Sequence, residues 1–332
     1  MPEDKSGEGR SLPLRPAAKQ RRPRSDKRGI DRGGQFGQLA SAVWRDKLTL
    51  ISLIILTTLL VAAVFPGFVA PYDHTQQDLL LRNLPPLSPN PHGGFPHIFG
   101  TDTLGRDVLS RVIRGSQTSM AVGGASVLVS GTLGSLLGVV AGFKRGRIDD
   151  ILMRLADIQL SFPTVLLALF VLFMIGGGLA NVVLILAVVR WPVYARVARG
   201  MTMSLRETAF VEASTAIGSS TLQQLRWHVV PNLLSPIVVL ATLEIARVML
   251  AEASLSFLGL GIQPPDTSWG LQIAQGREYV RVAWWLVTIP GFFIFLAALS
   301  VNLLASWVRA VTDPVQRWRW VASKTSASEA DS

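Results

Sequence analysis

Four long runs of uncharged, mostly apolar residues limit what this chain of 332 residues can fold into. They are Leu48–Ala70, Gly115–Phe143, Ile158–Val189 and Val282–Val308. A helix needs about 20 apolar residues to cross the hydrocarbon core of a bilayer, so each run can span a membrane. Charged residues make up only 16% of the chain, against roughly 25% in a typical soluble domain. We therefore predict an all-α membrane protein.

The run Ile158–Val189 is long enough for two spans. Gly176–Gly178 interrupts it, and three glycines permit a tight turn between helices. This predicts spans at Asp157–Ile175 and Leu179–Ala195. A further span is expected from Pro231 to about Leu260, although that segment contains three charged residues. The total is six transmembrane helices.

The distribution of lysine and arginine predicts the orientation. Of the 32 such residues, 25 lie before the first span, after the last, or in loops on the same side, whereas six lie in the alternate loops. Short loops rich in these residues stay in the cytoplasm. We expect both termini to be cytoplasmic, in a bacterial or archaeal cytoplasmic membrane. The net charge of +10 is then better explained by anionic lipid than by nucleic acid.

The chain divides into four parts. Residues 1–44 are rich in Pro, Gly, Ser and charge, and are expected to form a disordered basic cytoplasmic tail. Residues 45–114 hold the first transmembrane helix and an extracytoplasmic segment with an amphipathic helix. Residues 115–314 hold a core of five helices with a cytoplasmic loop at 206–231, and residues 315–332 form a cytoplasmic C-terminal tail.

The chain lacks the motifs of common nucleotide-binding and hydrolytic sites. It has no G-x-x-x-x-G-K-[ST] loop to hold phosphates, no H-E-x-x-H, no G-x-S-x-G and no cysteine. His92 and His97 flank Gly-Gly-Phe-Pro, but two imidazoles without a carboxylate or thiolate make a weak metal site. We expect neither an enzyme nor a metal or cofactor bound by this chain.

The stretch GTDTLGRDVLSR, residues 100–111, is predicted to form the amphipathic helix. Thr101 and Asp102 are suited to cap it, and Asp107 can pair with Arg111 one turn later. Its apolar stripe consists of Leu104, Val108, Leu109 and Val112. The helix would lie on the outer membrane surface, or would simply be a solvated surface helix.

Two of the predicted spans carry further signals. Glycines at positions 131, 134, 138 and 142 share one face of the second span and predict close contact with another helix. In the fifth span, Glu244 and Arg247 are i, i+3 neighbours, and Glu252 lies two turns after Glu244 on a similar face. Charges at this depth normally face a protein interior or an aqueous cavity. A structural ion pair and the lining of a translocation path are both open, with the path slightly favoured.

The loop between the fourth and fifth spans is predicted to contain two short helices. Thr208–Ile217 has a broken apolar stripe, and Gly218 suits the left-handed residue that ends a helix. Ser219, Ser220 or Thr221 can cap a second helix, and Pro231 can open the fifth span. Helices too short to be stable alone indicate docking into a groove of another protein, although a well-capped loop would give the same pattern.

This loop resembles the E-A-A-x-x-x-G loop of ABC-importer permeases, through Glu212, Ala213, Gly218 and Pro231. Two positions depart from that pattern, Ser214 for the second alanine and Val230 for the leucine before proline. Further blocks resemble the C-type subunit of the peptide/nickel permease subfamily: GTDTLGRDVLSR, LMRLADIQLSFPTVLLAL, WPVYARVARG, EASLSFLGLG with SWG, and Asp313-Pro314. The likeness covers nearly all of residues 48–314, including the extracytoplasmic motif Gly100, Thr101, Asp102, Gly105, Arg106 and Asp107.

The resemblance implies the type I importer fold and a set of partners. These would be a second permease subunit, two ATPase subunits that bind ATP and Mg, and an extracytoplasmic solute-binding protein. Glu212, Ala213 and Gly218 would seat the loop in a cleft of the ATPase. A secondary transporter driven by an ion gradient and a non-transporting membrane scaffold are the alternatives. The cargo is not named by the sequence, since dipeptides, longer peptides, nickel chelates, glutathione and opine-like compounds all fit such permeases.

Overall fold

The computed structural model describes residues 46–312, and the tails predicted at 1–44 and 315–332, with Asp313-Pro314, lie outside them. Within the described range the chain is helical and has no strands, only the isolated bridges Ser88–His97 and Thr101–Asp107. The long helices are α2 (Lys47–Val64), α4 (Val108–Lys144), α5 (Arg147–Leu160), α6 (Thr164–Ile175), α7 (Leu179–Arg206), α10 (Val230–Phe257) and α12 (Trp285–Thr312). Short helices are α3 (Pro66–Val69), α8 (Ala209–Ala216), α9 (Thr221–Gln224) and α11 (Trp269–Gly276).

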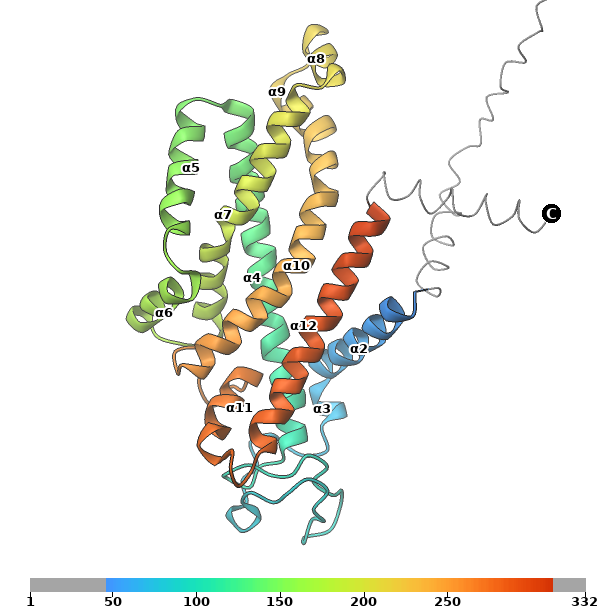
Figure 1. Ribbon diagram of the computed structural model, residues 1–332, viewed down its shortest axis with the longest axis vertical. Helices are drawn as coiled ribbons and strands as arrows, with labels where there is room; N and C mark the ends of the chain where they lie inside the picture. The colour runs from blue at the N-terminus through green and yellow to red at the C-terminus, as the bar shows by residue number, and fades with distance from the viewer. Residues whose placement is uncertain (1–45, 313–332) are drawn as a thin grey trace, which may run out of the picture. The chain divides into compact units, whose positions relative to one another are not determined.

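Two ends of the helix bundle can be distinguished (Figure 1). One, here called the α8 end, carries α8 and α9. The other, the α11 end, carries α11 and the long connection from α3 to α4. Within residues 46–312, five helical segments are long and apolar enough to cross a membrane, and a bent helix pair brings the number to six when counted as one span. This confirms the predicted spans at the first, second, fourth, fifth and sixth positions.

The third span differs from the prediction. The sequence suggested one continuous helix over Asp157–Ile175, whereas α5 and α6 meet at an angle of 88°. Pro163 lies in the break, where it disfavours helical backbone at Phe162 and supplies no N–H. As a result, α6 runs across the foot of α5 instead of continuing it (Figure 1). Gly176 and Gly178 then turn the chain into α7 with φ of 87° and 115°, as the triple glycine predicted.

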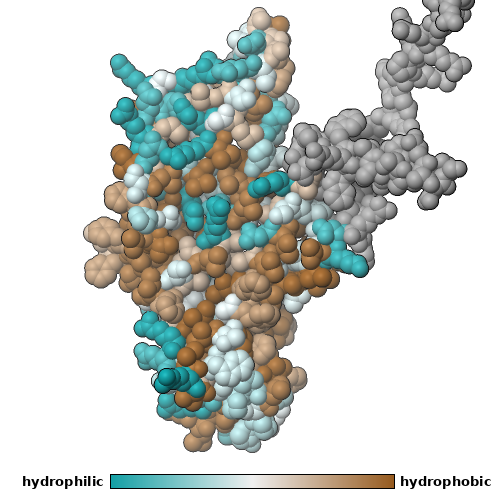
Figure 2. Space-filling model, viewed as in Figure 1, coloured by the Kyte–Doolittle hydropathy of each residue, from teal (hydrophilic) through white to brown (hydrophobic). Residues whose placement is uncertain are grey.

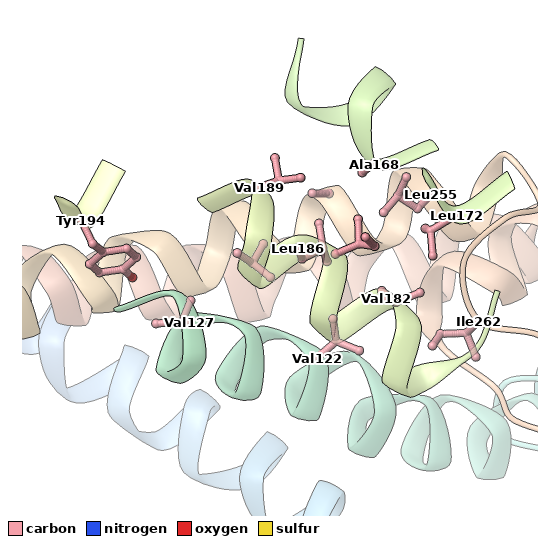
Figure 3. Packing of buried hydrophobic residues seen from close by; sticks show 13 residues of the cluster. Val122, Val127, Ala168, Leu172, Val182, Leu186, Val189, Tyr194, Leu255 and Ile262 are labelled. Atoms are coloured by element: carbon pink, nitrogen blue, oxygen red, sulfur yellow. The ribbon is translucent and has the colours of Figure 1, made fainter. Parts of the chain in front are cut away.

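The predicted glycine face of α4 forms its contact with α7. A Cβ on Gly134 would lie 2.3 Å from the carbonyl oxygen of Trp191, and one on Gly138 equally close to that of Ala195. Only glycine therefore allows the two backbones to approach this closely. The apolar core beside this contact joins α4, α6, α7 and α10, with Tyr194 at one end and Val182 and Ile262 at the other (Figure 3).

A side chain from α5 replaces a backbone hydrogen bond that is missing in α7. Pro192 has no N–H, so it cannot bond the carbonyl of Val188 one turn earlier. Gln159 Nε2 donates to that carbonyl at 2.7 Å, while Trp191 Nε1 donates to Gln159 Oε1 at 3.0 Å. Because a membrane interior offers no water to such groups, this bridge fastens α5 to α7 at the proline.

Candidate functional site

The segment 206–231 projects from the α8 end of the bundle (Figure 1). It has the predicted helix–glycine–helix form, since α8 ends at Ala216 and Gly218 has φ of 83°. Ser220 caps α9 through a capping box with Gln223, which selects one of the three predicted cap residues. Local cap chemistry therefore fixes the shape of the segment.

The segment is fastened on one side and open on the other. Gln224 Nε2 donates to Thr215 Oγ1 and to the Ser219 carbonyl, both at 3.1 Å, which ties α9 to α8. Glu212 and Ala213 are exposed on α8. Large apolar side chains are exposed around them: Phe210, Ile217, Leu222 and Trp227. This is a compact surface of apolar and acidic groups.

Pro231 lies in the first turn of α10, as predicted, but α10 continues directly from the helical turns before it. The helical path is continuous over Thr221–Phe257, and the π-turn η2 (Leu225–Val229) lies just before the proline. Pro231 cannot donate to the preceding turn, and a wider π-turn accommodates that loss. Asn232 Nδ2 donates to the His228 carbonyl at 2.6 Å, which adds a side-chain bond across the same turn.

A charged cluster lies half-way along α7 and α10. Glu244 is fully buried, and its Oε1 accepts from Arg247 Nη1 at 2.8 Å. This confirms the predicted i, i+3 pair. Arg190 Nη1 lies 3.4 Å from Glu244 Oε2. Arg190 was counted among the loop cations although the predicted span Leu179–Ala195 contains it, and it lies well inside α7.

Glu252 has different surroundings from Glu244. It is fully buried, and its oxygens accept from Ser256 Oγ at 2.7 Å and Ser119 Oγ at 3.3 Å. Ser119 Oγ also accepts from Trp269 N at 3.3 Å, at the start of α11. The carboxyl group therefore joins α4, α10 and α11 in a network without any arginine.

At the α11 end, the predicted amphipathic helix over residues 100–111 is wrong. Residues 100–106 form a loop, and α4 begins only at Val108 with Asp107 as its N-cap. Asp107 accepts from Ser110 N at 2.8 Å and contacts His97 Nδ1 at 2.9 Å, so it does not pair with Arg111. The capping and stripe signals were local, whereas long-range contacts decide the fold of this loop.

Asp102 is the centre of this loop. It accepts from Arg106 N at 2.9 Å and Arg106 Nε at 2.7 Å, and it is paired with Arg111. Arg111 Nη2 donates to Gln275 Oε1 at 2.7 Å, which links the pair to α11. All three charged side chains are largely buried.

The two glycines of the motif and Thr101 hold the same loop in place. Gly105 has φ of 74°, and a Cβ there would lie 1.7 Å from the Asp78 carbonyl oxygen. Gly100 has φ of 76°, and a Cβ there would lie 2.4 Å from the Leu84 carbonyl oxygen. The carbonyl of Thr101 accepts from Trp285 Nε1 at 3.1 Å. The motif Gly100–Asp107 thus acts as a structural lock between the loop and the starts of α4 and α12.

The histidines at this end have separate acidic partners. His97 binds Asp107, while His92 Nε2 lies 2.9 Å from Asp78. His74 lines a cavity of about 370 Å³ together with Arg106 and Gln275. Burial lowers the pKa of His74, and the nearby Arg114 acts in the same direction. In the described part of the chain, no three His, Asp or Glu side chains gather as a metal site would require.

The described chain is an all-α bundle of helices long and apolar enough to span a membrane, with a compact exposed surface of apolar and acidic groups at the α8 end. Residues 134–317 match the family model described as binding-protein-dependent transport system inner membrane component. Residues 38–86 match the N-terminal TM domain of oligopeptide transport permease C. The chain is 39% identical to the probable D,D-dipeptide transport system permease protein DdpC of Escherichia coli (strain K12), over 83% of this chain and 91% of that protein. It is 40% identical to the di/tripeptide transport system permease protein DppC of Pseudomonas aeruginosa (strain UCBPP-PA14), over 81% and 88%.

The chain therefore belongs to the family of binding-protein-dependent transport system inner membrane components. It is a multi-pass membrane permease of the ABC importer type, which confirms the resemblance to the C-type permeases and the predicted fold class. The relatives are transport permeases and not enzymes. Among solved structures, an inward-facing MetNI methionine ABC transporter matches with a TM-score of 0.48 and 20% identity, over 62% of this chain and 98% of that chain.

Proposed function

We propose that the chain is one of two different permease subunits in an ATP-driven importer for peptides or similar small solutes. The substrate class is supported by the names of its relatives, which include D,D-dipeptide, di/tripeptide and glutathione transport permeases. Two ATPase subunits would bind ATP and Mg, and an extracytoplasmic solute-binding protein would deliver the cargo. The chain itself would bind no cofactor, metal or nucleic acid.

The observation that carries the proposal is the segment 206–231. A chain without a phosphate-binding loop needs its energy delivered through a contact, and this segment offers exposed acidic and apolar groups on a capped scaffold. Glu212, Ala213 and Gly218 would seat it in the ATPase, with Pro231 at the junction with α10. Both termini would then be cytoplasmic, because the basic loops share the side of the α8 end.

The other predicted sites receive roles that follow from their geometry. Glu244 and Arg247 would line the translocation path, because Arg247 connects the cluster to an exposed surface. Glu252, enclosed by serine hydroxyls, would anchor α11 beside that path. The lock formed by Gly100–Asp107 would hold the surface on which the binding protein docks.

The test is the Glu212→Lys variant in the complete transporter. We expect normal membrane insertion, but loss of ATP-driven uptake and of ATPase stimulation by the loaded binding protein, because a cation replaces an anion at the contact. Asp150→Lys, an exposed acid of α5 at the α8 end but outside the segment 206–231, is the matched control for charge reversal. Normal transport by Glu212→Lys would contradict the docking role, and uptake that persists after ATP depletion would favour a carrier driven by an ion gradient.

A further inference from the structure

The charges in the cluster half-way along α7 and α10 do not balance. The Glu244 carboxylate faces both Arg247, at 2.8 Å, and Arg190, at 3.4 Å. One carboxylate between two guanidinium groups leaves one positive charge in excess. Arginine stays protonated in proteins, so titration cannot remove the excess charge. An uncompensated charge at this depth is costly and is normally tied to function.

Several polar atoms of the cluster have no partner. Among residues 46–312, Arg190 Nε, Glu244 Oε2 and the Tyr194 hydroxyl are buried and make no hydrogen bond. Tyr194 follows Arg190 by one turn of α7, so the two side chains lie on the same helix face. Buried polar groups are nearly always paired, because an unpaired one bears its full desolvation cost. The cluster therefore has both charge and bonding capacity that the chain alone does not use.

Arg247 brings the excess charge to an accessible surface. Its side chain is 63% exposed, whereas its partner Glu244 is fully buried. Figure 2 shows hydrophilic surface interrupting the apolar belt over the middle of α10. A guanidinium group cannot remain exposed to hydrocarbon at this depth, so this face of α10 must meet water or a polar group.

We propose that Arg190, Glu244 and Arg247 form a recognition site for the free carboxylate of the transported solute, with Arg247 as the first contact. The proposal rests on the function proposed above. A carboxylate can accept two parallel hydrogen bonds from one guanidinium group, and it would neutralise the excess charge while bound. Glu244 Oε2 can accept from the ammonium group of the same zwitterion. Peptides carry both groups, so the cluster complements them in charge.

The experiment uses the complete transporter, with its partner subunits and binding protein, in liposomes. ATP-driven uptake of a defined mixture of di- and tripeptides is compared by mass spectrometry with uptake of their C-terminal amides. Because the binding protein is the same in every sample, its own preference cancels when each variant is divided by wild type. The variants are Arg247→Gln, which removes the charge, and Arg247→Lys, which keeps it. Leu250→Gln is the control, since it adds polarity on the exposed side of α10 without removing charge.

In Arg247→Gln, uptake of the free acids is expected to fall about tenfold more than uptake of the amides, as for a lost charge-assisted bond. Arg247→Lys should recover only part of this difference and leave the ratio about threefold below wild type, and Leu250→Gln should not alter the acid-to-amide ratio. An equal fall for acids and amides would overturn the proposal and would favour pairing of Arg247 with an acidic residue of the second permease. Absence of ATP-driven uptake in wild type would instead contradict the proposed function. If Arg247→Gln fails to assemble, Arg247→Lys must still lower the ratio about threefold, because lysine cannot form the paired bonds.

Discussion

Two clusters in the described part of the chain, each with one carboxylate between two arginines, differ in how many of their polar atoms have partners. At the α11 end, Asp102 accepts from Arg106 and Arg111, and Arg111 also donates to Gln275. Half-way along α10, Glu244 lies between two arginines, but one of its oxygens has no hydrogen bond. The first cluster is closed within the chain and the second is open to another molecule. Similar residue types therefore serve as scaffold in one place and, as we propose, as a binding site in the other.

The largest effect is expected when the closed cluster is opened. Asp102→Ala leaves Arg111, which is only 6% exposed, without its carboxylate. Breaking a buried pair in this way costs about 3–5 kcal/mol of folding free energy. Thermal unfolding of the purified protein in detergent measures the loss, with the exposed Asp266→Ala as control. A change below about 1 kcal/mol would show that the lock is not needed for stability.

A pair of glycine substitutions separates backbone strain from steric clash in the same lock. Gly105 and Gly146 have φ of 74° and 67°, so alanine is strained at both by about 1–2 kcal/mol. Only at Gly105 does the new Cβ collide, with the Asp78 carbonyl oxygen, whereas nothing lies within 4 Å at Gly146. We expect Gly105→Ala to be less stable than Gly146→Ala by about 1–3 kcal/mol in the same unfolding assay. Equal losses of stability would mean that the Asp78 backbone moves away from the new Cβ without a cost in folding free energy.

The uncharged bridge made by Gln159 between α5 and α7 gives a reference value for the stability lost in the two charged clusters. Gln159→Leu removes the donor to the Val188 carbonyl and the acceptor for Trp191 Nε1. The expected loss is about 1–2 kcal/mol, the cost of leaving buried polar groups unpaired. Gln77→Leu, at an exposed position of the α11 end, is the control. If both variants unfold at the same temperature, the bridge from α5 to α7 contributes nothing measurable.

The smallest effect on stability is expected in the open cluster. Arg247→Gln removes the exposed member of its pair with Glu244, and the buried Glu244 carboxylate still has Arg190 at 3.4 Å. Arg111→Gln, in the closed cluster, should cost several times more. Both variants can be compared in one unfolding experiment. A larger loss for Arg247→Gln than for Arg111→Gln would reverse the assignment of scaffold and binding site.

The sequence predicted the elements that depend on local signals. Span positions follow from apolar length, and the form of the segment 206–231 follows from Gly218 and the Ser220 cap. The break at Pro163 was missed because a run without charges was treated as one helix, although the proline was visible.

Long-range contacts could not be predicted in the same way. Nothing near Gly105 in the sequence indicates that the Asp78 backbone fills the space beside it, or that Trp285 binds the Thr101 carbonyl. Capping and periodicity therefore suggested a helix where the protein has a loop. Arg190 was counted with the loop cations although the predicted span Leu179–Ala195 contains it, and no local signal indicated its contact with Glu244.

The continuous helical path from Thr221 to Phe257 has a mechanical consequence. It makes α9, the π-turn and α10 one continuous rod whose first turns lie in the segment 206–231, where we propose that the ATPase docks. Arg247 lies 23 residues beyond Gln224, roughly 35 Å at 1.5 Å per residue. If an ATPase tilted the first turns of this rod, Arg247 would move sideways further than those turns do. The π-turn before Pro231 interrupts the regular α-helical hydrogen bonding, so the rod should bend most easily there. A stiffer turn would pass more of the tilt on to Arg247.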